Sequence, residues 1–294
     1  MEKYNDLFAN SFRGYATYLW QEILHPHWGN YFYWLIAISL AVFALELLFP
    51  WRKNQPALRQ DFWLDGFYMF FNFFLFSLIG YAAVSNVAVQ AFNDFLASVF
   101  GIRNLVAVNV ASWPHWTQLL TLFLIRDFIQ WNIHRLLHYV PWLWRFHKVH
   151  HSVTQMGFAA HLRYHFMENI VYRTIEYLPL AMIGFGIQDF ILVHLFAITI
   201  GHLNHANFYL PLGPLRYLLN SPQMHIWHHS KELPEGSRGV NYGITLSLWD
   251  YLLGTVWMPK DGRDIELGFP GLEQFPKSFW KQEVSPFFKR KQRE

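Results

Sequence analysis

Residues 134–151 read HRLLHYVPWLWRFHKVHH, and residues 225–229 read HIWHH, which repeats the spacing at the end of that stretch. Together the two stretches hold eight of the sixteen histidines in the chain. Spacings of three and four residues place two imidazoles on one face of a helix, one turn apart. Histidine is also the commonest side-chain ligand of metal ions in proteins. These stretches therefore predict helices that chelate metal.

The H-x-x-H-H motif occurs twice and predicts two metals. His147 can share a helix face with both His150 and His151, whereas those two neighbours diverge by roughly 100° around the helix. The same argument applies to residues 225–229. Adjacent ligands suit two different metals, so we expect a paired centre that each motif bridges from one side.

Nine histidines make up the predicted ligand set: the two motifs, an H-x-x-x-H pair before them and a single histidine between them. They are His134, His138, His147, His150, His151, His205, His225, His228 and His229. Two metals with four or five nitrogens each would use the whole set and leave room for water or an oxygen species. Four other histidines have no partner at helical spacing in a polar segment and are expected to be ordinary residues: His25, His27, His115 and His194.

The chain has no cysteine, which narrows the choice of metal. Thiolate zinc sites, iron–sulfur clusters and disulfides are excluded. An all-imidazole set suits iron, copper, zinc or nickel. Nine ligands exceed the four of structural zinc and the three of catalytic zinc, so we expect two iron ions in a redox centre.

The composition is that of a membrane protein, with 53% hydrophobic, 20% aromatic and 15% charged residues. Three apolar stretches are long enough to cross a ~30 Å hydrocarbon core: 31–50, 62–85 and about 105–125. Two shorter ones, 170–183 and 190–200, are joined by a glycine-marked turn and read as a helical hairpin. The predicted fold is all-α, with three spans plus a hairpin that carry a cytoplasmic helical metal domain.

The basic residues predict the orientation. They gather around residues 52–59, 135–148 and 277–293, whereas 86–116 holds only Arg103. By the positive-inside rule every histidine cluster lies on the cytoplasmic side and the N-terminus outside. No cleavable signal peptide is apparent, so the first span is expected to direct targeting. The net charge is +3, and the basic residues are spread over membrane-facing loops and the tail. This distribution favours attraction to anionic lipid headgroups and argues against nucleic-acid binding.

The order of the motifs resembles a known family. An H-x-x-x-H pair, H-x-x-H-H, a single histidine in NHAN, a second H-x-x-H-H and a closing NYGITLSLWDYLLGT are similar to the fatty acid hydroxylase / sterol desaturase superfamily of integral-membrane di-iron oxygenases. The resemblance covers roughly residues 119–259. We accordingly divide the chain into an N-terminal transmembrane region (1–115), a catalytic domain (116–260) and a basic C-terminal tail (261–294).

The resemblance implies an iron- and O2-dependent enzyme that hydroxylates or desaturates an unactivated C–H bond of a lipid, and it assigns the same nine histidines as metal ligands. Sterols, fatty acyl chains, ether lipids and carotenoids are all substrates within the superfamily, and hydroxylation is favoured here. The sequence has no haem, flavin or iron–sulfur motif, so a separate ferredoxin, cytochrome or reductase is expected to supply electrons.

Two further positions near the ligand set stay open. Some members of the superfamily place histidine or glutamine four residues before the single later ligand, where this chain has Gly201. His202 is either a tenth ligand, three residues before His205, or a hydrogen-bond partner of the site. Asp127 lies on one helical stripe with His134, so it either accepts a proton from a ligand histidine or pairs with a base such as Arg126.

Three more residues are weaker candidates. His161 and His165 are four residues apart and could chelate by spacing alone. The family resemblance instead puts this region in a polar network outside the first coordination sphere, with Arg163, His165 and Glu168 as matching positions. Asn241 belongs to the closing element and is expected near the metals without a defined role.

Two other functions fit some of these features. A zinc-dependent membrane hydrolase using the same histidines would turn over without oxygen or reductant. A metal transporter would need ionisable residues at mid-membrane depth in several spans, whereas the histidine clusters lie beyond the ends of the predicted spans.

Overall fold

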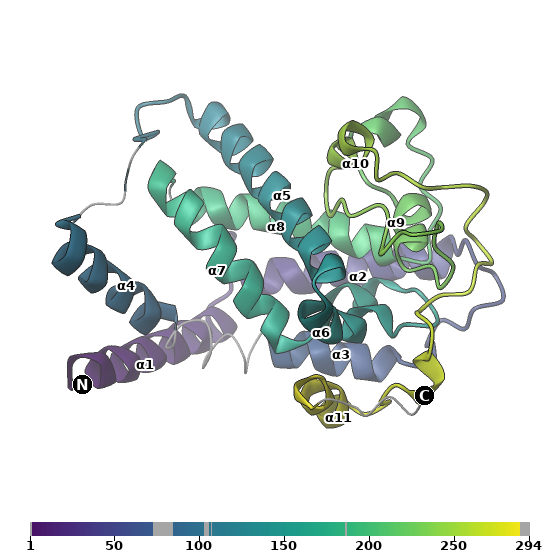
Figure 1. Ribbon diagram of the computed structural model, residues 1–294, viewed down its shortest axis with the longest axis horizontal. Coiled ribbons are helices and arrows are strands. Elements are labelled where there is room, and N and C mark those ends of the chain that lie inside the picture. The colour runs from purple at the N-terminus through teal and green to yellow at the C-terminus, as the bar shows by residue number, and fades with distance from the viewer. Residues whose placement is uncertain (1, 73–84, 103–105, 107, 186, 289–294) are drawn as a thin grey trace.

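The computed structural model describes residues 2–72, 85–102, 106, 108–185 and 187–288, and in these ranges it is helical, with isolated β-bridges and no strand. Figure 1 shows the arrangement. The α-helices are α1 (Glu2–Leu24), α2 (Tyr31–Leu48), α3 (Phe62–Phe70), α4 (Ser85–Phe100), α5 (His115–Tyr139), α6 (Pro141–His151), α7 (Phe166–Ile183), α8 (Ile187–His205), α9 (Pro222–His228), α10 (Leu248–Leu253) and α11 (Phe279–Val284). Short 3-10 turns are η2 (Phe158–Leu162), η3 (Gly213–Tyr217), η4 (Leu272–Gln274) and η5 (Ser285–Phe287). The all-α expectation is confirmed for these residues.

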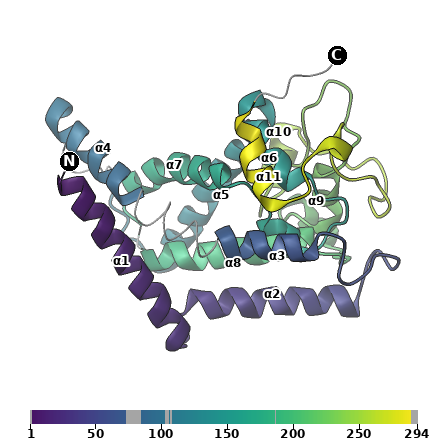
Figure 2. The same ribbon diagram turned by 90° about the horizontal axis from the view of Figure 1, so that it is seen from below.

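The histidine-bearing helices form the centre of the molecule. Helix α5 packs against α6, α7 and α8, and α8 also contacts α2, α9 and the turn η2. Figure 2 shows α2 running alongside α8. Segments far apart in the sequence therefore meet around the inner end of α5, where its two motif histidines lie.

Local sequence signals place the histidine helices. Pro141 occupies the first turn of α6, directly after Val140 ends α5, because the fixed φ of proline suits the start of a helix. In α9, Pro222 has the same role, and the Ser221 side chain caps the helix by accepting from the Met224 N–H. The first two histidine motifs thus lie on consecutive helices joined by one residue.

Among the described residues, one helix is long and apolar enough to cross a membrane, namely α2, which coincides with the first predicted span. Helix α3 begins the second predicted span, but residues 73–84 of that span lie outside the described residues. Crossing of a membrane by the later helices stays a prediction.

The predicted bounds of the third span, 105–125, are wrong. Residues 108–114 are not helical, and α5 begins at His115 and continues to Tyr139. The helix starts directly after Pro114, a residue that disfavours helix at the position preceding it. The apolar stretch therefore straddles a turn and only part of α5.

The predicted turn at Gly184 is where α7 ends. Gly184 adopts a left-handed conformation with φ of 68°, which glycine tolerates best, and α8 follows at Ile187. Two consecutive helices are therefore present where a hairpin was predicted. Their insertion into a membrane from one side stays a prediction.

The two ends of the chain pack differently from each other. Helices α1 and α4 contact each other and lie off the main body in Figure 1. The start of the C-terminal tail, by contrast, is anchored, because Phe279 of α11 is buried against Phe67, Tyr68 and Phe71. This part of the predicted basic tail belongs to the folded body.

Candidate metal centre

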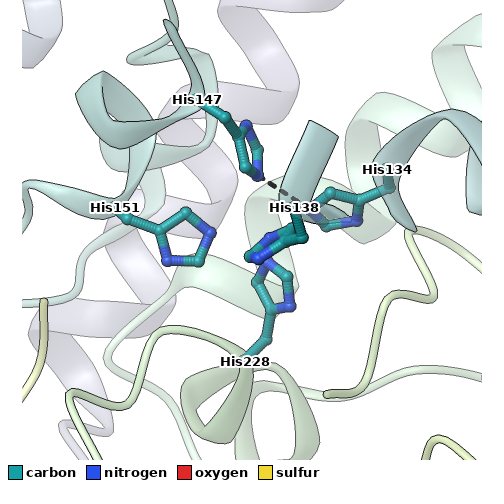
Figure 3. Close-up of side chains that lie close together, drawn as sticks. All are labelled: His134, His138, His147, His151 and His228. Carbon is teal, nitrogen blue, oxygen red and sulfur yellow. Dashed lines mark hydrogen bonds between the residues drawn. The ribbon is translucent and has the colours of Figure 1, made fainter. Parts of the chain in front are cut away.

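The nine predicted ligand histidines converge, and all are buried. The first group is His134, His138, His147, His151 and His228, and the second is His150, His205, His225 and His229. Within each group, one ring nitrogen of every histidine lies within 4.8 Å of one ring nitrogen of each of the others. Figure 3 shows the first group, with the five rings gathered around one point. The expected division into sets of four and five nitrogens is therefore present in the geometry.

Adjacent histidines divide between the two groups, as the 100° argument predicts. His151 and His228 belong to the first group, whereas their neighbours His150 and His229 belong to the second. His147, which could have faced either, lies in the group of His151. Each H-x-x-H-H motif therefore contributes to both groups.

The two groups lie side by side. The rings of His151 and His229, one from each group, stack with centroids 4.5 Å apart, and the rings of His150 and His229 are 4.6 Å apart. Two ions held by these groups would be neighbours. The geometry is that of a paired centre.

Hydrogen bonds orient the rings. Six of the nine histidines direct Nδ1 at an oxygen: His134 at Tyr242 O (2.7 Å), His138 at Arg238 O (3.1 Å), His147 at Glu168 Oε2 (2.8 Å), His150 at Arg163 O (3.1 Å), His205 at Gly201 O (2.8 Å) and His228 at Val240 O (2.7 Å). A carbonyl oxygen only accepts, so Nδ1 carries the proton in those rings. A neutral ring then has a bare lone pair on Nε2, the form in which it binds metal.

The bare nitrogens face one another. His134 Nε2 lies 3.2 Å from His147 Nε2, and His205 Nε2 lies 3.2 Å from His150 Nε2. With Nδ1 protonated, neither member of these pairs has a proton to share. The buried Nε2 atoms of His138 and His228 have no hydrogen-bond partner among the described residues. Opposed lone pairs and orphaned nitrogens are satisfied by a cation between them, so the residues fit the metals that the sequence implied.

Burial keeps these histidines neutral. Desolvation lowers the pKa of His134 to about 4 and that of His150 to about 3, and it lowers the pKa of His228 well below 6.5. A protonated imidazole cannot bind metal, so this shift favours the ligand form at neutral pH.

Among the described residues, Glu168 on the first turn of α7 is the one carboxylate that accepts from one of the nine rings, that of His147. Burial alone raises the pKa of Glu168, but a cation on the far side of the His147 ring would hold the carboxylate ionised. The residue makes the contact of an outer-sphere partner, as the family resemblance implied.

Asn241 does not face the histidines but shapes the loop that orients two of them. Its φ of 51° is left-handed, and its side chain donates to Met224 O and Trp257 O. The flanking residues Val240 and Tyr242 supply the carbonyls for His228 and His134. Asn241 therefore lies between two residues that hydrogen-bond the histidines, and its position near the metals stays a prediction.

Asp127 does not contact a ligand histidine. It accepts from Trp249 Nε1 at 2.8 Å and from the N–H groups of Thr245 and Leu246 at 3.3 Å each. Arg126, the alternative partner, contacts Glu176 of α7. Both readings of Asp127 from the sequence were wrong, because the backbone of the closing loop supplies its partners.

His202, His161 and His165 lie outside both groups. His202 bonds to His161 through their Nδ1 atoms at 3.0 Å and to Ser39 Oγ at 3.2 Å. His165 caps α7 and bonds to the main chain of Glu283. His202 therefore bonds to residues outside the nine histidines, and whether it is a tenth ligand stays a prediction.

Two glycines not singled out as site residues make room for the rings. A Cβ on Gly201 would collide with the imidazole of His161, whose ring lies 5.1 Å from that of His205. A Cβ on Gly239 would lie 2.7 Å from His138 Nδ1. Gly201 lies four residues before His205, which was the available signal, whereas Gly239 is ten residues from His229 and carried none.

A cavity of about 500 Å³ opens from the histidines. Its inner end is lined by rings of both groups: His134, His147, His150, His205 and His225. Its walls include apolar side chains of α1, α2 and α8, among them Leu19, Phe32, Leu35 and Ile198. The cavity has the size and lining of a site for an elongated, largely apolar molecule.

Comparison with known proteins agrees with this geometry. Residues 119–255 match the family Fatty acid hydroxylase. The chain is similar to ornithine lipid hydroxylase OlsE of Rhizobium tropici, with 29% identity over 95% of this chain and 81% of that protein. It is also similar to alkylglycerol monooxygenase of Xenopus tropicalis, with 33% identity over 56% of this chain and 36% of that protein. No solved structure matches.

A third relative is named for a reaction other than hydroxylation. Very-long-chain aldehyde decarbonylase GL1-6 of Oryza sativa subsp. indica is 26% identical over 54% of this chain and 25% of that protein. The chain therefore spans most of the first relative and between a quarter and about a third of the other two. The motif order agrees with the family match, and both place a fatty acid hydroxylase domain at residues 119–255.

Proposed function

We propose that the chain is a membrane-bound, di-iron, O2-dependent oxidoreductase that hydroxylates an unactivated C–H bond of a lipid. The observation that carries the proposal is the pair of adjacent buried histidine groups whose bare nitrogens open on a cavity with apolar walls. The similarity to a lipid hydroxylase over 95% of the chain favours hydroxylation over desaturation.

The proposed reaction needs electrons from outside the chain. Insertion of one oxygen atom into R–H consumes O2, two electrons and two protons and yields R–OH and water. Bound iron would supply the activation of O2, and a separate ferredoxin, cytochrome or reductase would supply the electrons. The chain has no cysteine to hold an iron–sulfur cluster of its own.

The residues of the chain contribute position and a dry environment. The six Nδ1 hydrogen bonds fix the rings before any metal arrives, so little reorganisation accompanies binding. The apolar walls exclude water around the reacting carbon and hold it beside the histidines.

The location of the enzyme in the membrane is part of the proposal. Helix α2 is long and apolar enough to span a bilayer. We propose further spans among the later helices, with the third span inside α5 and not at 105–125, and with the histidines on the cytoplasmic side. A lipid chain would then enter the cavity from the bilayer.

The test is turnover of membrane lipid extract by purified, iron-loaded protein with a chemical or protein reductant under 18O2. The proposal predicts one 18O atom per product molecule and no product without oxygen or reductant. Hydrolysis products formed without oxygen by a zinc-loaded protein would contradict it.

A further inference from the structure

A group of charged residues lies in the cavity away from the metal centre. Arg126 of α5 and Glu176 of α7 are 5% and 3% exposed, and Arg173 and His194 line the same space. Arg126 Nη2 is 3.3 Å from His194 Nδ1. None of these side chains contacts the two histidine groups in the hydrogen bonds of the described residues.

The pair of Arg126 and Glu176 is incompletely satisfied. Arg126 Nε lies 3.8 Å from Glu176 Oε2, which is too long for a hydrogen bond. Arg126 Nε and Glu176 Oε1 are both buried without a hydrogen-bond partner among the described residues. A buried charged group without its hydrogen bonds is strongly destabilising, so these two atoms are suited to bind the polar group of a ligand.

In a membrane protein, a buried ion pair such as Arg126 and Glu176 is a stronger indication of a functional site. Ionisable side chains within membrane helices are costly and mark substrate or ion pathways. A buried ion pair can often be replaced by apolar residues of similar volume with no loss of stability. Packing between α5 and α7 alone therefore does not explain the pair.

The charged group sits at a set distance from the histidines. On α5, Arg126 and His134 both line the cavity and are separated by about 12 Å along the helix axis. On α7, Glu176 and Glu168 both line it with the same separation of about 12 Å. The cavity therefore joins a charged end to the metal centre, and one elongated molecule can reach both.

The charges at that end define the complementary ligand. Arg126 and Arg173 are cations and Glu176 is an anion, so the group carries both signs with an excess of positive charge. Guanidinium binds carboxylate or phosphate, and a carboxylate binds ammonium. Apolar side chains of the wall such as Leu35 and Ile198 suit acyl chains.

We propose that Arg126, Arg173 and Glu176 form a subsite for the zwitterionic polar group of a lipid, with its acid group on the arginines and its amine on Glu176. This inference rests on the proposed function for the reaction and adds the class of lipid. The subsite fixes which carbon of the lipid lies beside the histidines.

Binding to iron-loaded full-length protein in detergent under argon tests the subsite without turnover. The probes are an ornithine lipid, a phosphatidylethanolamine and a diacylglycerol with the same acyl chains, followed by tryptophan fluorescence. We expect at least one zwitterionic lipid to bind about tenfold or more tightly than the diacylglycerol, the size of one lost hydrogen bond to a charged group. The tighter zwitterion identifies whether the acid is a carboxylate or a phosphate. Equal affinity for all three overturns the proposal.

Single substitutions test whether the selectivity for zwitterionic lipids depends on the residues of the subsite. Glu176→Gln and Arg126→Gln are each expected to weaken zwitterion binding about tenfold and to leave diacylglycerol binding unchanged. Arg135→Gln, an exposed arginine on the same helix, and Glu273→Gln, an exposed glutamate, are the matched controls. Equal losses for both lipids in folded variants contradict the proposal. If a variant does not fold, the comparison of lipids on the unaltered protein still decides.

Products separate this inference from the proposed function. Where 18O2-dependent hydroxylation occurs, the unaltered protein is expected to oxidise one position and the Glu176→Gln variant a mixture, because the lipid is no longer held in register. A single unchanged position in the variant contradicts the subsite. Zwitterion-selective binding without any oxygen-dependent product would instead refute the proposed function and leave the subsite standing.

Discussion

The histidine-bearing region, residues 115–258, holds most of the buried polar residues of the described chain, whereas the N-terminal region, residues 2–72 and 85–102, holds few of them. In the former, buried polar groups meet specific partners, as when Asp250 accepts from the N–H groups of Tyr242 and Gly243. In the latter, large apolar side chains stay exposed, with Trp28 at 88% and Leu40 at 61%. In the first region, contacts between individual residues determine the geometry of the site. In the second, the apolar composition suits the membrane that we propose around it.

Loss of one ligand histidine should have the largest effect. His228→Ala and His150→Ala each remove a ring from one group, and we expect turnover to fall by more than the ten- to hundredfold typical of an outer partner, together with loss of bound iron. Turnover and metal analysis of the purified variants measure this. Full activity in either variant would refute the ligand assignment, whereas His27→Ala, an exposed histidine, should change neither value.

Lowering the pH should destabilise the histidine-bearing region and weaken metal binding. Burial lowers the pKa of the ligand histidines, to about 4 for His134 and about 3 for His150, from an ordinary value of 6.5. A base whose pKa is lowered in the folded state stabilises the fold above its unfolded pKa, and that contribution is lost as pH falls towards the folded pKa. We therefore expect the melting temperature and bound metal to fall from pH 6.5 towards pH 4. A flat profile across that window would contradict the assignment.

The outer partner Glu168 should have an intermediate effect. Glu168→Ala removes the acceptor of His147 Nδ1, and we expect a ten- to hundredfold loss in iron affinity or turnover. Glu168→Gln keeps an acceptor oxygen and should lose less. Titration with Fe²⁺ under argon compares the two, and identical affinities for the alanine variant and the unaltered protein would exclude this role.

Asp250→Asn tests the loop that carries the orienting carbonyls. The asparagine presents an NH2 group or a single oxygen where two N–H groups and Trp131 Nε1 now donate, so we expect a loss of about 1–3 kcal/mol in the free energy of unfolding. Thermal denaturation in detergent measures it, with the exposed Asp264→Asn as control. Matching melting curves for the two variants would show that this network does not stabilise the loop.

Trp63→Ala, in the N-terminal region, should have the smallest effect. The side chain is 74% exposed, so we expect a change within about 0.5 kcal/mol in the free energy of unfolding in detergent and unaltered turnover. A large loss in either measurement would break the contrast between the two regions, because it would show that an exposed aromatic there supports the metal centre.

The same contrast explains how far prediction from the sequence reached. The division of the adjacent histidines between two groups follows from helical periodicity, because side-chain type and spacing carry the information. The bounds of α5 do not follow, because an apolar stretch continues across the turn at Pro114 and hydropathy alone does not register the turn.

The partners of the rings were largely beyond prediction. Five of the six oxygens that accept from Nδ1 are backbone carbonyls, such as Tyr242 O and Arg238 O. Because every residue has a carbonyl, the sequence does not indicate which one will face a ring. The contact of Arg126 with Glu176 joins two helices whose packing no single-helix pattern specifies. Such contacts depend on tertiary structure, and the local sequence does not contain them.

X-ray absorption at the iron edge, on full-length protein loaded with Fe²⁺ under argon and paired with metal analysis, tests the central claim most directly. The account predicts two irons per chain, each bound mainly by nitrogen, with a second iron visible as a near neighbour. One iron per chain, or two irons without nitrogen ligands, would contradict it.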